Sequence, residues 1–151
     1  MKELLEHFYA LMEYLYEADL ESVVFLILID LGFPPGRMPI VYLKDAVLLY
    51  RKKPEQLLTY ELYPDVGKRN GKARRTQIEM AIRREIKSCC LKRRPEKWQL
   101  YFPCGIKSKK PIPSNLELIV AINQLLKIWE NCKENYIKHM KEGDNHEQND
   151  I

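Results

Sequence analysis

The chain has 151 residues, of which 46% are hydrophobic and 30% are charged, and its formal net charge is +4. These values fit one soluble globular domain and exclude a disordered or collagen-like chain. The longest apolar run, residues 23–29, is far shorter than the roughly 20 residues of a membrane helix. The N-terminus also lacks the features of a signal peptide, so we expect a cytoplasmic protein without a membrane partner.

Cysteine and histidine usage argues against an enzyme. Cys89 and Cys90 are adjacent, the other two cysteines are isolated, and no C-x-x-C pair exists, so a zinc site is poorly supported and reduced thiols are expected. All three histidines lie near the termini, which deprives the middle of the chain of the commonest general base. P-loop, Rossmann, zinc-protease and nucleophile-elbow motifs are missing. We therefore expect no catalytic residues, no metal and no cofactor.

Charge is strongly segregated along the chain. Residues 67–97 contain twelve basic and three acidic residues, whereas residues 1–31 contain one basic and seven acidic residues. Residues 130–151 are again acidic, with three basic and six acidic residues. A basic block of this kind is typical of a nucleic-acid-binding surface, but a solvated helix face would have the same composition. Charge alone does not separate the two interpretations.

The first half of the chain predicts short helices. Apolar residues at three- and four-residue intervals indicate a helix over 2–17. Asp19 is a candidate N-cap for a second helix, and Gly32 is a natural residue to end it. A third helix is expected over 42–50 and a short one over 55–60. Alternating strand patterns are missing, so the predicted fold class is all-α, a multi-helix domain with an extra N-terminal helix.

The second half predicts two longer helices, over 74–91 and from Ser114 to about residue 136. Ser114 and Glu117 form a capping box, in which each side chain satisfies a backbone N–H of the other. Residues 98–113 are expected to be mostly loop, with a turn over 98–101. The resulting division is an N-terminal helix over 1–18, a helical domain over 19–137 and a polar, disordered tail over 138–151.

Residues 62–92 predict a helix-turn-helix. Gly67 and Gly71 stand four residues apart, as expected where two helices cross closely and the turn needs a permissive backbone. Apolar anchors follow at Ile78, Ala81 and Ile82, one residue later than the commonest spacing, which implies a longer turn. An ordinary helical hairpin would satisfy the same spacing.

A rotation of 100° per residue sorts the second helix of this pair into two faces. Ile78, Ile82, Ile86 and Cys89 form the buried stripe, and Glu85 lies on the same side, where it would need a basic partner. The exposed face and the turn supply the DNA-binding candidates. The base-reading candidates are Thr76, Gln77, Glu79, Met80 and Arg83, and the phosphate-binding candidates are Lys68, Arg69, Lys72, Arg74, Arg75, Arg84 and Lys87.

Several sequence stretches, in order and with similar spacing over about residues 20–128, match one known family. The chain resembles the C-terminal effector domain of the stage-zero sporulation protein A, a response regulator of endospore-forming bacteria. The matching stretches are residues 31–34, 42–47, 62–68, 78–83, 110–111 and 113–119.

The resemblance implies a helical domain whose glycine-turn helix pair reads a short element of double-stranded DNA. It also implies binding as tandem or paired copies and contact with RNA polymerase. Glu79 matches the family's base-reading glutamate, and Arg83 matches its arginine one turn later. Gln77 and Met80 replace arginines of the family's reading surface, and the turn is one residue longer, which leaves the DNA sequence open.

Two features of the N-terminal part leave alternatives open. The roughly 20 residues before the matched region cannot hold the family's receiver domain, so the chain is a stand-alone relative, which we favour, or an excised fragment. The helix over 2–17 either forms a homodimer or packs on the core. The leading hypothesis is a sequence-specific DNA-binding transcriptional regulator. The alternatives are a protein-interaction module that keeps the fold and an architectural protein that binds DNA without reading it.

Overall fold

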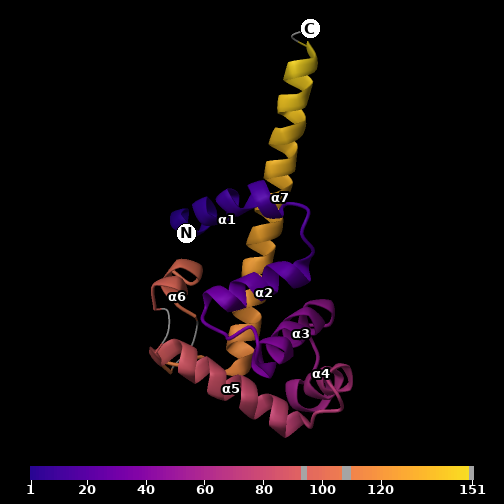
Figure 1. Ribbon diagram of the computed structural model, residues 1–151, viewed down its shortest axis with the longest axis vertical. Coiled ribbons are helices and arrows are strands. Elements are labelled where there is room, and N and C mark those ends of the chain that lie inside the picture. Colours follow the sequence, from indigo (N-terminus) through magenta and orange to yellow (C-terminus); the bar gives the residue numbers. More distant parts are fainter. Residues whose placement is uncertain (93–94, 107–109, 150–151) are drawn as a thin grey trace.

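The computed structural model describes residues 1–92, 95–106 and 110–149, and in that part of the chain all regular structure is helical (Figure 1). The predicted all-α class is confirmed. The long helix α7 forms the axis, and the shorter helices pack along its N-terminal half. The elements are α1 (Lys2–Leu15), α2 (Leu20–Asp30), α3 (Met38–Lys52), the π-helical turn η1 (Leu58–Leu62), α4 (Tyr63–Arg69), α5 (Arg75–Lys92), α6 (Pro95–Tyr101) and α7 (Asn115–Asn149).

Local capping interactions set several helix ends where the sequence predicts them. The Asp19 carboxylate accepts a hydrogen bond from the Ser22 N–H at 2.8 Å and caps α2. Gly32, just after α2, has φ of 103°, a backbone conformation that favours glycine. The capping box before α7 is complete: Glu117 N–H donates to Ser114 Oγ at 3.2 Å, and Ser114 N–H donates to Glu117 Oε1 at 2.9 Å.

Other boundaries differ from the prediction. Helix α3 begins at Met38, because Pro39 is well suited to a first helical turn, where its missing N–H needs no partner. The short helix expected over 55–60 is instead the π-helical turn Leu58–Leu62. The expected turn over 98–101 belongs to helix α6, which begins at Pro95.

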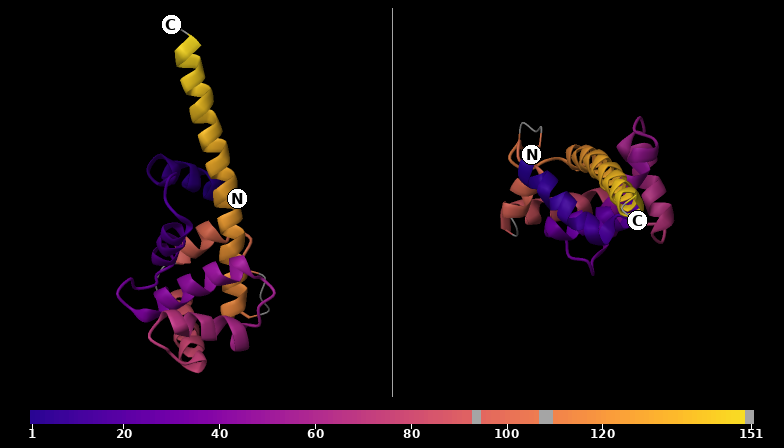
Figure 2. Two further views of the ribbon diagram at one scale, coloured as in Figure 1. Left: turned by 90° about the vertical axis from the view of Figure 1, so that its right-hand side faces the viewer. Right: turned by 90° about the horizontal axis from the view of Figure 1, so that it is seen from above.

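The C-terminal helix is longer than predicted. Disorder is predicted from residue 138, whereas α7 continues through Asn149 and projects beyond the other helices (Figure 2). Extending an existing helix costs little per residue, and Gly143, its least favourable described residue here, costs only about 1 kcal/mol relative to alanine. The last two residues of the predicted tail, 150–151, lie outside the described residues.

Helix α1 is part of the core rather than an appendage. It packs against α7, and Leu4, Phe8 and Met12 are buried. The Phe8 ring meets the edge of the buried Trp129 ring, with 5.3 Å between ring centroids. The apolar stripe that the sequence offers for dimerisation is therefore largely used within the chain.

A polar cluster ties α1 to α2 and α6. The Tyr101 hydroxyl donates to Asp30 Oδ2 at 2.5 Å, and His7 Nε2 lies 3.1 Å from the same hydroxyl. Because that hydroxyl gives its proton to Asp30, the His7 ring donates to it through Nε2. Burial is the main reason why the pKa of His7 is lowered.

None of the helices in the described residues combines the length and apolar character that crossing a membrane demands.

Candidate nucleic-acid interface

Helices α4 and α5 and the turn between them occupy the segment predicted for a helix-turn-helix. Gly67, inside α4, faces the turn so closely that a Cβ atom there would lie 2.3 Å from the Ala73 carbonyl oxygen. Its own carbonyl accepts backbone hydrogen bonds from Asn70 and Lys72, which fold the chain back at this point. A side chain at position 67 would therefore collide first with the backbone of the turn, which explains the requirement for glycine.

The longer turn has a structural explanation. Gly71 and Lys72 both have left-handed backbone conformations, with φ of 68° and 62°. Such a conformation costs a non-glycine residue roughly 1–2 kcal/mol, so Lys72 is held there by its surroundings. The turn between α4 and α5 therefore contains two consecutive left-handed residues.

Asn70 anchors this turn to α3, a contact that the sequence did not reveal. Its side-chain amide donates to Asp45 Oδ2 and to the Val66 carbonyl, both at 2.8 Å. Asp45 is buried, and Lys44 Nζ lies 3.9 Å from its other carboxylate oxygen. In the sequence, the only sign of this contact is that Asp45 is an acid within an otherwise apolar helical stripe.

The two faces of α5 match the prediction. Its buried stripe consists of Ile78, Ile82, Ile86 and Cys89, each 0% exposed. Glu79 is half-buried, whereas the other four base-reading candidates are exposed: Thr76, Gln77, Met80 and Arg83. All seven phosphate-binding candidates are exposed on α4, the turn and α5: Lys68, Arg69, Lys72, Arg74, Arg75, Arg84 and Lys87. Apart from the half-buried Glu79, both predicted sets are thus accessible to a ligand.

Several of these charged side chains have partners within the chain. Arg83 Nη1 lies 3.4 Å from Glu79 Oε1, one helical turn earlier. The Arg75 guanidinium lies over the Tyr60 ring, 5.0 Å from its centroid, and Lys68 is 3.9 Å from Asp65. Exposed pairs of this kind contribute at most about 1 kcal/mol, so they orient the side chains without preventing them from binding a ligand.

The start of α7 braces the outer side of α5. Asn115 is buried, and its amide donates to the Tyr63 hydroxyl at 2.9 Å and to the Glu79 carbonyl at 3.1 Å. Burial raises the pKa of Tyr63, which keeps the phenol protonated. The side-chain amide of Asn115 thus connects α7 to both α4 and α5.

Glu85 has the basic partner that its position requires. This side chain is buried on the inner side of α5, and its Oε1 lies 4.0 Å from Arg37 Nη1. Arg37 precedes α3, so the pair joins the connection after α2 to α5. An isolated buried carboxylate would be costly, and pairing reduces that cost.

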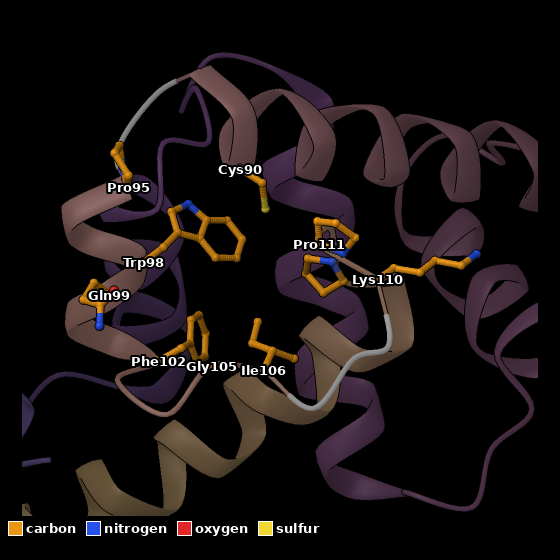
Figure 3. A pocket seen from close by; sticks show the side chains of 10 residues that line it. Cys90, Pro95, Trp98, Gln99, Phe102, Gly105, Ile106, Lys110 and Pro111 are labelled. Atoms are coloured by element: carbon orange, nitrogen blue, oxygen red, sulfur yellow. The ribbon is translucent and has the colours of Figure 1, made fainter.

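An apolar cavity of about 260 Å³ lies on the side of α5 that faces α6 (Figure 3). Trp98 and Phe102 form one wall and Pro111 another, and Trp98 Nε1 donates to the Leu31 carbonyl at 2.9 Å. Burial raises the pKa of Cys90, at its edge, to about 11, so the thiol is protonated and a poor nucleophile. The described residues that line this cavity include no pair of side chains suited to acid–base catalysis.

The described ranges contain no group of three histidine, cysteine, aspartate or glutamate side chains placed to hold an ion. The exposed cations over α4, the turn and α5 form the candidate interface.

Comparison with known proteins identifies the family. Residues 24–126 match the family model described as sporulation initiation factor Spo0A C terminal, a span that begins within α2, contains α3 to α6 and ends within α7. A search of curated proteins found no match. The matched span covers more than half of the chain and agrees with the helical architecture. The chain therefore belongs to the Spo0A C-terminal family of DNA-binding effector domains.

Proposed function

We propose that this protein is a transcriptional regulator that binds double-stranded DNA sequence-specifically, with α4 and α5 acting as a helix-turn-helix. The observation that carries the proposal is the one-sided surface of α5, which is apolar and buried inside and cationic outside. A major groove accepts one helix, and cations beside that helix neutralise phosphates.

Glu79 and Arg83 are the proposed centre of base reading. A glutamate can accept a hydrogen bond from cytosine N4, and an arginine can donate two to guanine O6 and N7. Their contact at 3.4 Å holds both side chains on the outer face of α5. Thr76, Gln77 and Met80 flank them, and Met80 suits apolar contact with a thymine methyl group.

The seven exposed cations are proposed to bind the DNA backbone and to position α5. Each neutralised phosphate releases counterions, so the logarithm of the binding constant falls with the logarithm of salt concentration by about 0.9 per contact. Alanine at Arg84 or Lys87 should weaken binding to all duplexes similarly and reduce this slope by roughly one.

The test begins with selection from random duplexes, followed by affinity measurements on preferred and scrambled sites at several salt concentrations. Arg83→Ala should cost about 1–3 kcal/mol on the preferred site and erode discrimination at one base position. Lys141→Ala is the matched control, because Lys141 is exposed and belongs to the C-terminal part of α7, a segment that projects away from α5 (Figure 1). Equal loss on both duplexes with Arg83→Ala would contradict its base-reading role.

A protein-interaction module is the alternative function. Met80 is 38% exposed on the outer face of α5, where an apolar side chain also suits a protein partner. If the intact protein binds neither duplex at low salt, this alternative replaces the DNA-binding proposal.

RNA polymerase and a second copy of the chain are proposed as further partners on the basis of the family resemblance. Sedimentation of the intact protein, alone and with a duplex carrying two sites, measures self-association directly. A monomer under both conditions would contradict the paired-copy proposal.

A further inference from the structure

A groove of about 520 Å³ runs along the outer side of α5, between this helix and the start of α7. Arg83 and Lys87 line it from α5, and Lys110 lines it from the segment that precedes α7. Among the described residues of this lining Glu79 is the one acid, and Arg83 Nη1 lies 3.4 Å from its Oε1. The groove thus joins cations from two segments that are distant in the sequence, and its charge favours an anion.

Lys110 borders both this groove and the apolar cavity beside Trp98. Figure 3 shows its side chain leading away from Trp98 and Phe102, so its ammonium group is not directed into the apolar cavity. Pro111 and Pro113 restrict the backbone after it, and Pro113 is buried. Lys110 is therefore presented from a segment of restricted backbone freedom.

Asn115 contributes a buried polar side chain to the lining of the groove. The hydrogen bonds from its amide to Tyr63 and Glu79 hold α7, α4 and α5 together. Its Oδ1 is buried and has no hydrogen-bond partner among the described residues. Ser114 also lines the groove, at the capped start of α7.

We propose that this groove takes a backbone phosphate of the DNA duplex, held between Lys87 on one side and Lys110 on the other. The inference rests on the proposed function and extends it, because it adds the segment before α7 as a second DNA-contacting element outside the helix-turn-helix. A phosphate gripped from two sides fixes how α5 lies along the groove of the DNA. Lys110 is thus a positioning residue for the base-reading face.

The test compares Lys110→Gln with Lys141→Gln in the full chain. Both remove one exposed lysine charge, and circular dichroism melting verifies that both variants fold. On the preferred duplex, Lys110→Gln should lower affinity by roughly threefold to tenfold and reduce the salt slope by about one. Lys141→Gln should change neither quantity, and Lys110→Arg should restore most of the affinity.

A duplex with one neutral methylphosphonate, moved position by position, locates the phosphate. At the contacted position the modification should weaken the wild-type protein and add no further loss to Lys110→Gln. If Lys110→Gln keeps the wild-type slope while Lys87→Gln reduces it, the groove proposal is overturned and the DNA-binding proposal stands. If the wild-type protein binds no duplex at low salt, both fail. Displacement of bound duplex by millimolar inorganic phosphate at constant ionic strength would instead indicate a free-anion site.

Discussion

Replacing Gly67 with alanine should destabilise the protein, although alanine is the better helix former. Gly67 lies within α4, where glycine-to-alanine substitution ordinarily stabilises by about 1 kcal/mol. Here the new Cβ atom would lie 2.3 Å from the Ala73 carbonyl oxygen and 3.4 Å from Ile78 Cδ1. The first contact must lengthen to at least 3.0 Å, and its partner is backbone rather than a movable side chain.

The cost follows from what must shift. Moving Ala73 disturbs a turn that is held by two hydrogen bonds to the Gly67 carbonyl, from Asn70 N–H at 3.1 Å and Lys72 N–H at 2.9 Å. Overpacking of this kind costs about 1–3 kcal/mol, more than the gain in helix propensity. We expect a net loss of up to about 2 kcal/mol and a further loss of DNA affinity, because α5 would be displaced.

Two other glycines separate the steric effect from the backbone effect. A Cβ atom at Gly71 would meet no atom within 4 Å, but φ of 68° should make Gly71→Ala cost about 1 kcal/mol. Gly36 has open space and no such φ, so Gly36→Ala should be neutral or slightly stabilising. Urea unfolding followed by tryptophan fluorescence measures all three. A Gly67→Ala protein as stable as wild type would refute the reasoning.

The remaining predictions concern the contacts that join distant elements. Asn70→Ala should lower the free energy of unfolding in urea by about 1–3 kcal/mol, because it leaves the buried Asp45 carboxylate without its amide donor. An unchanged free energy of unfolding would contradict the anchoring role of Asn70. The pKa of His7 is lowered from 6.5, so the folded state binds this proton more weakly than the unfolded state, and stability falls as pH drops through 6.5 toward the lowered pKa. Between pH 7.5 and 5.5, His7→Gln should lose less free energy of unfolding than the wild type loses. An equal loss in the two proteins would contradict the assignment of this pH dependence to His7. Deleting residues 1–17 should remove several kcal/mol, since it uncovers Trp129; a deletion variant that melts like wild type would show that α1 is dispensable.

The sequence by itself determined the features that depend on near neighbours. Helix caps at Asp19 and Ser114 were predictable because donor and acceptor lie three residues apart. The two faces of α5 were equally predictable, since helical periodicity converts residue spacing directly into direction. The DNA-binding candidates could be named for the same reason.

Only the tertiary structure decided how distant elements meet. Asn70 finds Asp45 on α3, Arg37 finds Glu85, and Asn115 joins the hydroxyl of Tyr63 to α5. No local pattern encodes these pairs, because each depends on the angle and register at which separate helices pack. The same packing places Lys110, which directly precedes Pro111, beside α5. Its side chain therefore lines a groove next to the proposed DNA surface. Periodicity along one helix cannot predict a site that is assembled between helices.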